Sequence, residues 1–105
     1  MVIQREFQPA VYLIASARNG TLYLGVTSNL PQRIAQHRAG VFEGFAKRHG
    51  CKMLVWFEIH ATMDHAITRE KQLKKWNRSW KMRMIEEANK NWRDLAEDLG
   101  FETLR

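Results

Sequence analysis

Residues 10–26 read AVYLIASARNGTLYLGV, and they decide the fold because they predict two β-strands joined by a tight turn. The first part, residues 10–16, is a short apolar run with strong β character. Asn19 and Gly20 tolerate positive φ angles, and a second run of strand type, residues 21–26, follows them. The stretch therefore predicts an antiparallel β-hairpin.

Side chains alternate along a strand, so the hairpin has two faces. If the loop has an even number of residues, the numbers of two residues that face each other across the hairpin sum to an odd number. One face is entirely apolar, and we expect it to be the core. The other combines tyrosines with small residues, and we expect it to border a site. The apolar face consists of Val11, Leu13, Ala15, Leu22, Leu24 and Val26. The mixed face consists of Tyr12, Ile14, Ser16, Tyr23, Gly25 and Thr27.

A helix and a third strand are expected to follow the hairpin. Asn29 is a favourable N-cap, Gln32 lies three residues later as in a capping box, and Gly40 ends the helix. Residues 41–50 are expected to form a loop or irregular turn. Residues 53–59 then predict a strand that is apolar on both sides apart from one glutamate.

The rest of the chain is predicted to be helical. Thr62 or Asp64 can cap a helix that continues into the seventies, and a more broken helical stretch covers residues 80–90. Residues 92–99 predict a last short helix, which Gly100 ends. The predicted fold class is α/β (α+β), with a small three-stranded antiparallel sheet flanked by helices in the order β-β-α-β-α-α.

Length and composition limit the classes of protein that fit. The 105 residues suit a single domain spanning residues 1–105, and 17 Lys+Arg against 11 Asp+Glu favour a polyanionic partner. Cys51 is the only cysteine, so no internal disulfide forms and a reducing, cytoplasmic location is expected. Residues 1–6 do not resemble a signal peptide, and no apolar run is long enough to span a membrane.

Two short motifs of the hairpin resemble the signature that names the GIY-YIG nucleases: Ala10-Val11-Tyr12 and, ten residues later, Tyr23-Leu24-Gly25. Arg33 and Glu70 sit where that family places its arginine and glutamate. Ala10 departs from the signature by replacing its first glycine, which a strand accommodates.

The likeness covers about residues 9–85 and leaves a helical tail over about 86–105. Residues 69–76 look closest to the small stand-alone bacterial members, which are related to the N-terminal nuclease domain of an excision-repair protein. The resemblance therefore implies a metal-dependent endonuclease that hydrolyses DNA phosphodiester bonds, with a place in DNA repair.

The resemblance implies that Glu70 holds the metal, Mg²⁺ or Mn²⁺. Such hard cations often use only one or two protein carboxylates. Helical spacing puts Glu70 on one stripe with Ala66 and Leu73, where an ionised carboxylate is costly unless it is paired or metal-bound. The same stripe would continue through Asn77, Trp80 and Met84. The alternatives are that Glu70 reaches solvent or forms an ion pair with Arg33.

Arg33 is expected to bind phosphate through its guanidinium. The resemblance implies that Tyr12 and Tyr23 are active-site tyrosines, one of them the general base, although a phenol of pKa ~10 needs nearby cations to act at neutral pH. His37 shares a helical face with Arg33 and is a candidate proton relay. Each of the four has an alternative structural role as a packed ring, a buried histidine or a surface charge.

Basic residues are expected to contact nucleic acid, most simply DNA. The candidates are Lys47, Lys71, Lys74, Lys75 and Arg78. The downstream residues alternate with Trp76 and Trp80, which predicts a phosphate-binding ridge with aromatic patches or a solvated helix face with the tryptophans turned to the core. Both can hold together, with the lysines outward and Trp80 inward, and the direction of Trp76 stays open. Asn77 is either a site residue or a helix cap. The rival to the nuclease is a non-catalytic or weakly active DNA- or RNA-binding module of the same fold.

Overall fold

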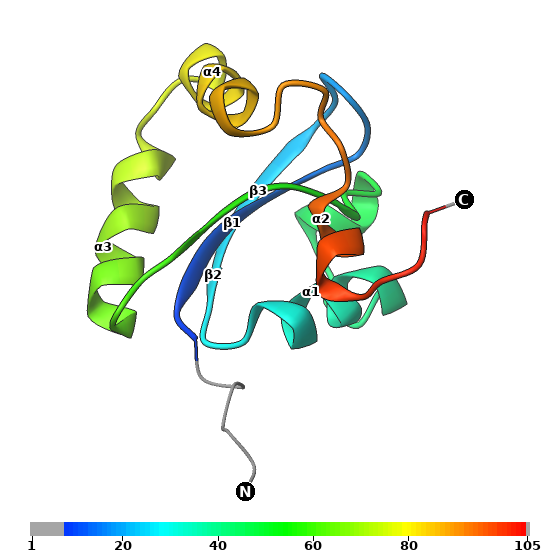
Figure 1. Ribbon diagram of the computed structural model, residues 1–105, viewed down its shortest axis with the longest axis horizontal. Helices are drawn as coiled ribbons and strands as arrows, with labels where there is room; N and C mark the ends of the chain where they lie inside the picture. The colour runs from blue at the N-terminus through cyan, green and yellow to red at the C-terminus, as the bar shows by residue number, and fades with distance from the viewer. Residues whose placement is uncertain (1–7, 105) are drawn as a thin grey trace, which may run out of the picture.

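The computed structural model describes residues 8–104. Expectations for residues 1–6, and for the two ends of the single domain, lie outside the described residues. Three antiparallel strands form the sheet: β1 (Ala10–Ala15), β2 (Leu22–Thr27) and β3 (Met53–Ile59). β1 is central and β2 and β3 are the edges (Figure 1). The predicted strands and their order are confirmed.

The hairpin has the predicted register, with Tyr12 opposite Gly25 and odd sums throughout. Asn19 takes the positive φ of 59° that the turn requires. The backbone N–H of Thr21 donates to Ser16 Oγ at 2.9 Å and closes the loop. The local turn residues therefore fix the register on which the two faces depend.

Helix α1 (Leu30–Ala39) begins and ends where its capping residues predict. Asn29 Oδ1 accepts the N–H of Gln32 at 3.1 Å, and Gly40 ends the helix in the left-handed region with φ 71°. The N–H of Asn29 donates to Thr27 Oγ1 at 3.0 Å. The predicted N-cap therefore forms. In a capping box the side chain of Gln32 would accept the N–H of Asn29, but here Thr27 accepts it instead.

The prediction of a loop over residues 41–50 is corrected by a short helix, α2 (Phe45–Arg48). Its N-cap is Gly44, which has no side chain to form a capping hydrogen bond. Four residues are also too few to display a helical period. Sequence patterning therefore offers no signal for this element.

Helices α3 (Met63–Lys74) and α4 (Arg78–Ala88) follow β3. Thr62 Oγ1 accepts the N–H of His65 at 3.1 Å, so Thr62 is the cap of α3. Asn77 caps α4 by accepting the N–H of Trp80 at 2.9 Å, which gives it the structural role of the two considered. A short 3-10 helix, Leu95–Leu99, ends at Gly100. No described helix combines the length and the apolar character needed to cross a membrane.

The break between α3 and α4 overturns two expectations. The stripe through Ala66, Glu70 and Leu73 is buried, but it stops at the end of α3 and does not continue to Trp80. The prediction that Trp80 turns to the core is wrong, because its side chain is 51% exposed. Ile85 is the residue by which α4 enters the core.

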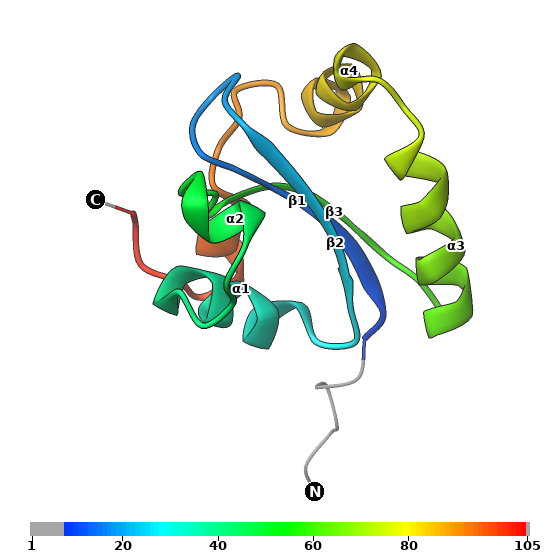
Figure 2. The ribbon, with the colours of Figure 1, turned by 180° about the vertical axis from the view of Figure 1, so that it is seen from behind.

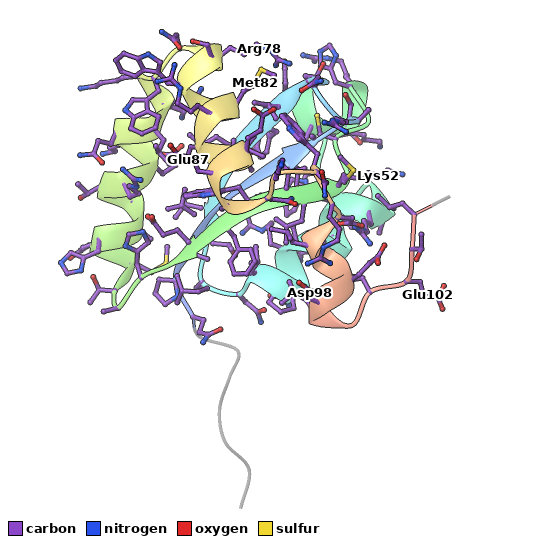
Figure 3. All side chains as sticks on the ribbon, turned by 45° about the horizontal axis from the view of Figure 1, so that its top comes forward. Lys52, Arg78, Met82, Glu87, Asp98 and Glu102 are labelled. Carbon is purple, nitrogen blue, oxygen red and sulfur yellow. The ribbon has the colours of Figure 1, made fainter. Side chains whose placement is uncertain are left out.

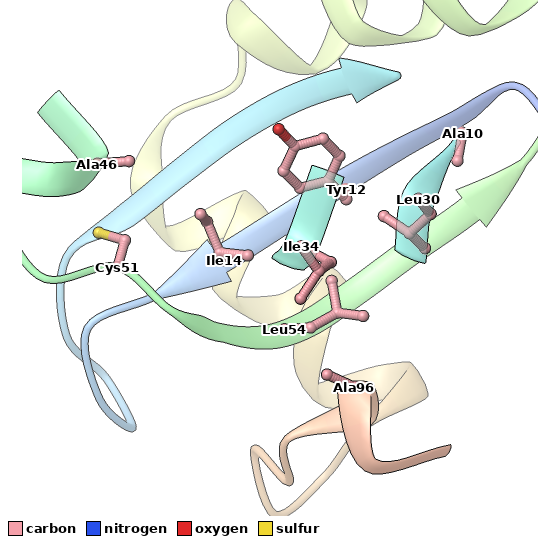
Figure 4. Packing of buried hydrophobic residues seen from close by; sticks show 9 residues of the cluster. All are labelled: Ala10, Tyr12, Ile14, Leu30, Ile34, Ala46, Cys51, Leu54 and Ala96. Atoms are coloured by element: carbon pink, nitrogen blue, oxygen red, sulfur yellow. The ribbon is translucent and has the colours of Figure 1, made fainter. Parts of the chain in front are cut away.

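The sheet is covered on both faces, so the mixed face of the hairpin is also core. Tyr12 and Ile14 pack with α1, α2 and the 3-10 helix (Figure 4). Val11 and Leu13 pack against α3 and α4 on the opposite face. Figures 1 and 2 show the three layers, with α1 and α2 on one side of the sheet and α3 and α4 on the other. A mixed face that packs against a helix layer can still border a site at the sheet's edge.

Candidate active site

An open pocket of about 400 Å³ lies along the edge strand β2. Its lining includes residues of α1 and α2 on one side of the sheet and of α3 and α4 on the other. Figure 2 shows these two pairs of helices with the sheet between them. Strands β1 and β2 and helices α1, α3 and α4 each contribute polar residues to the lining, whereas α2 contributes Phe45. The polar residues are Tyr12, Tyr23, Arg33, Glu70, Lys74 and Lys81. The structure thus brings together four of the five predicted catalytic residues around one pocket. The fifth, His37, does not line the pocket but contacts Tyr12 and Tyr23.

Gly25 is what allows Tyr12 to reach this edge. A Cβ on Gly25 would lie 2.4 Å from both Cζ and the hydroxyl of Tyr12, so the tyrosine ring occupies the space that any side chain would need. Figure 4 shows the Tyr12 hydroxyl reaching toward β2. The signature glycine and the signature tyrosine are therefore parts of one packing arrangement.

Three rings form a cluster beside the pocket. The Tyr12 hydroxyl is 2.8 Å from His37 Nε2. The His37 ring lies 5.7 Å from the Tyr12 ring and 5.5 Å from the Tyr23 ring, both edge-on. His37 is 8% exposed and Tyr12 is fully buried, whereas Tyr23 is half-buried and makes no hydroxyl hydrogen bond to another residue in 8–104.

Burial controls the protonation of two of these rings. It raises the pKa of Tyr12, and the neighbouring Tyr23 adds to this while Arg33 only partly opposes it. Burial, and then the charge of Arg33, lower the pKa of His37. At neutral pH both are therefore uncharged, and we assign the phenol as donor and His37 Nε2 as acceptor, with the histidine proton on Nδ1.

Arg33 is held at the pocket without being neutralised there. Its guanidinium carbon lies 5.0 Å from the centre of the Phe42 ring, a cation–π contact. Its Nε is buried with no hydrogen-bond partner among residues 8–104, and no carboxylate of those residues forms an ion pair with it. An arginine in this state favours an anionic ligand.

Glu70 is a nearly buried carboxylate that faces the same pocket. Its side chain is 12% exposed, and Oε2 lies 3.3 Å from Nζ of Lys74, one helical turn later. The ion pair with Arg33 considered from the sequence does not form; Lys74 takes that place. Among the residues the structure describes, no group of three or more His, Cys, Asp or Glu side chains could hold a metal ion. Glu70 is the one carboxylate of the described residues that lines the pocket, and a single carboxylate suits an ion such as Mg²⁺, whose other ligands are water and phosphate oxygens.

Of the five residues predicted to contact nucleic acid, one lines this pocket and four do not. Lys74 lines the pocket, and Lys71 and Lys75 are exposed on and beside α3. Arg78 donates from Nη2 to the carbonyls of Asn19 and Gly20 at 2.8 and 2.7 Å, so it fastens α4 to the hairpin loop. Lys47, the remaining predicted contact, forms an ion pair with Glu43 and does not line the pocket.

Three residues join the site that were not among the predicted catalytic set. Phe42 supports Arg33, Phe45 lines the pocket at 44% exposure, and Lys81 lines it from α4. Lys81 lies three residues after Arg78, the last of the basic candidates named from the sequence. The two phenylalanines follow α1 in a segment with no periodic pattern, so the sequence carries no local signal for them.

Comparison with known proteins agrees with this geometry. Residues 8–83 match the profile of the GIY-YIG catalytic domain, well over half of the chain. This chain belongs to the GIY-YIG family. The match covers Tyr12, Tyr23, Arg33 and Glu70, so a nuclease-family domain contains the whole polar cluster.

Individual relatives in this family are small proteins of similar length. A UPF0213 protein of Staphylococcus haemolyticus is 35% identical over 77 residues, which are 73% of this chain and 93% of that protein. A UPF0213 protein of Clostridium perfringens is 33% identical over 75 residues, or 71% and 80%. The solution structure of a UPF0213 protein from Bacillus halodurans superposes with a TM-score of 0.53 at 20% identity, covering 86% of this chain and 95% of that one. That last likeness supports the fold.

Proposed function

We propose that this chain is a metal-dependent endonuclease that hydrolyses DNA phosphodiester bonds at the pocket on β2. The observation that carries the proposal is the convergence of Tyr23, Arg33 and Glu70, from three separate elements, on one open pocket. GIY-YIG nuclease domains act on nucleic acids, and this chain matches that domain. A net charge of +6 and a single buried cysteine, Cys51, agree with a protein that meets a polyanion in a reducing cytoplasm.

Arg33 binds the scissile phosphate in this proposal. Its guanidinium offers paired N–H donors to phosphate oxygens and keeps its charge at any working pH. Phe42 fixes its orientation from one side. A bound phosphate would also neutralise the charge of Arg33, which forms no ion pair with a carboxylate of the described residues. Lys74 and Lys81 add positive charge around the same phosphate.

Tyr23 is placed to orient the attacking water or to accept its proton. Both tyrosines line the pocket, but Tyr23 is the half-buried one, and its hydroxyl has no partner within residues 8–104. Tyr12 and His37 support it from behind as a neutral hydrogen-bonded pair. Arg33 lines the same pocket and would hold the phosphate that this water attacks.

Glu70 would hold the divalent ion, Mg²⁺ or Mn²⁺, as its single protein ligand. When bound, the ion supplies counter-charge to the phosphate oxygens in the transition state. Lys74 would exchange its ion pair with Glu70 for a contact with phosphate. The pair is 3.3 Å long and links an exposed lysine, so releasing it costs little.

The Glu70–Lys74 pair also supports the alternative, a non-catalytic or weakly active module that binds DNA or RNA. With Lys74 in place, Glu70 has a partner without any metal. The two proposals share the same basic pocket and differ in whether the phosphodiester is cut.

The deciding experiment incubates the purified chain with supercoiled and branched DNA in Mg²⁺, in Mn²⁺ and in EDTA. The endonuclease proposal expects nicked or linear products with either metal and none in EDTA. Retained DNA binding with no cleavage under every metal condition would favour the binding module instead. Cleavage that persists in EDTA would point to a contaminating nuclease, and the Glu70 variant described below identifies that case.

A further inference from the structure

A second pocket, of about 350 Å³, lies between α3 and α4 on the side toward β3. None of its lining residues lines the pocket on β2. Arg69 and Trp76 contribute from α3 and the turn after it, and Trp80, Arg83, Met84 and Glu87 contribute from one face of α4. In Figure 3, Arg78 and Glu87 mark the two ends of α4.

The centre of this pocket is a pair of tryptophans. The rings of Trp76 and Trp80 meet edge to face, with centres 5.8 Å apart and planes at 83°. Trp80 remains 51% exposed, although its neighbour on α4, Ile85, is fully buried. A large aromatic ring that the fold leaves open beside a pocket is available to stack with a planar ligand.

Two arginines, Arg69 and Arg83, line the pocket beside the tryptophans, together with one acid, Glu87. Residues 69–83 as a whole include seven Lys or Arg residues and one acid, Glu70, although Lys74 and Lys81 line the pocket on β2. Arg69 is positioned by Glu58 and Gln72, each at 3.0 Å, and its guanidinium carbon lies 5.6 Å from the Trp76 ring centre. A planar ligand joined to negative charges matches both features, and a nucleic-acid strand has this chemistry.

We propose that the Trp76–Trp80 pocket binds an unpaired base of single-stranded nucleic acid. A base in a duplex is stacked on its neighbours and cannot reach Trp80, whereas an unpaired base presents a free face. Glu87 is the one acid of the lining; its carboxylate repels phosphate and can accept hydrogen bonds from base amino groups. The phosphates on either side of the base contact the surrounding lysines and arginines.

The same two helices carry Glu70, Lys74 and Lys81 on their side toward β2. A strand held at Trp80 would therefore continue over α3 and α4 to the catalytic pocket. This inference rests on the proposed function for the identity of the partner, and it narrows the substrate to nucleic acid with a single-stranded part, such as a flap or branch.

The test measures binding alone, by fluorescence anisotropy in EDTA with the full chain. The probes are a single strand of ~20 nucleotides as DNA and as RNA, the same DNA strand with abasic sites, and the blunt duplex. The variants are Trp80→Ala and Trp80→Phe, which retains an aromatic ring. Ile59→Ala is the matched control, because Ile59 is a similarly exposed apolar residue outside both pockets.

Trp80→Ala should weaken single-strand binding about 5- to 100-fold, the range for loss of one stacking residue, while duplex binding changes less than about twofold. Trp80→Phe should fall between wild type and Trp80→Ala, and Ile59→Ala should match wild type. The preferred strand, DNA or RNA, is the one whose affinity the alanine variant lowers more.

Unchanged single-strand affinity in Trp80→Ala would overturn the inference, as would an abasic strand that binds as tightly as the intact one. Sedimentation of the free protein provides a further check: a dimer that Trp80→Ala dissociates would assign the pocket to self-association and also overturn it. Because no step requires cleavage, an inactive wild-type protein would refute the proposed nuclease and leave this result interpretable.

Discussion

At the scale of single residues, the two hairpin tyrosines differ in access to solvent. Tyr12 is fully buried and bonded to His37, whereas Tyr23 faces the pocket with its hydroxyl unpartnered among residues 8–104. Tyr23 is therefore the more exposed of the two tyrosines that line the pocket. The proposal therefore gives proton transfer to Tyr23 and a supporting role to Tyr12.

Tyr23→Phe should lower single-turnover DNA cleavage by roughly 10²–10⁴, the usual effect of losing a general base. Its free energy of unfolding should change by no more than about 1 kcal/mol, because the ring and its packing remain. Tyr12→Phe is the matched variant: it should cost stability, about 1–3 kcal/mol, by leaving His37 Nε2 buried without a donor. Wild-type cleavage in both variants would refute this mechanism, and activity lost only in His37→Ala would move the base role to His37.

His37 makes a separate prediction about pH. Because burial lowers its pKa in the folded state, the unfolded chain binds a proton first as pH falls below about 6.5. Stability from His37 is therefore complete above that pH and is lost as pH falls toward the folded pKa. Urea unfolding from pH 7.5 to 5 should show this loss in wild type, at most about 1.4 kcal/mol per pH unit, and less in His37→Gln. Parallel pH profiles for the two proteins would contradict the buried, neutral histidine.

At the scale of elements, the parts of the fold that could be predicted depend on neighbouring residues. Asn19-Gly20 set the hairpin register, and Asn29 and Gly40 set the bounds of α1, because turn and cap chemistry acts over three or four residues. The short α2 and the exposure of Trp80 could not be predicted this way. The first has no period, and the second depends on the break at Asn77, which redirects α4.

The candidate site follows the same division. Tyr12, Tyr23, Arg33 and Glu70 could be named from motif positions, and the structure places them around one pocket. The partner that Glu70 takes, Lys74, has the i,i+4 spacing of a helical ion pair and could have been named from the sequence, whereas the distance of Arg33 from α3 depends on the whole fold. Phe42 and Phe45 depend on the path of residues 41–50, which no local pattern determines.

Asp94 is the clearest element-scale test, because one buried carboxylate joins three segments. It accepts the N–H of Leu54 in β3 and the N–H of Ala96, each at 3.1 Å, and pairs with Arg38 of α1. Asp94→Ala would remove the only ion-pair partner of Arg38 among the described residues and the acceptor of the Leu54 N–H, which should cost about 3 kcal/mol or more. The expected fall in Tm exceeds about 10 °C by calorimetry. Asp98→Ala, which breaks only an exposed pair with Arg93, is the control and should leave Tm nearly unchanged; an equal fall in both would refute the role of Asp94.

At the scale of the whole molecule, the positive charge is unevenly placed. Lys71 and Lys75 are exposed on α3 and at its C-cap, on the helix that carries Glu70 and Lys74 of the pocket, whereas Lys52, labelled in Figure 3, is exposed just before β3 and does not line the pocket. Each phosphate neutralised by the protein adds about 0.9 to the slope of log affinity against log salt for duplex DNA. The distribution predicts that the slope depends on which lysines are removed.

Replacing Lys71 and Lys75 together by glutamine should lower that slope by as much as about 1.8, while Lys52→Gln leaves it unchanged. The measurement is duplex affinity across a salt series in EDTA. A wild-type slope near zero, or equal losses in both variants, would remove the α3 surface from the proposed interface.

The most direct test of metal-dependent cleavage at this pocket compares Glu70→Gln with Glu43→Gln, a matched removal of charge at an exposed position. Cleavage in saturating Mg²⁺ and DNA affinity in EDTA are measured on both proteins, with unfolding curves to confirm that each is folded. We predict that folded Glu70→Gln loses metal-dependent cleavage and binds DNA within a few fold of wild type, while Glu43→Gln cuts normally. Cleavage by Glu70→Gln at the wild-type rate would contradict the proposed role of Glu70 as the metal ligand.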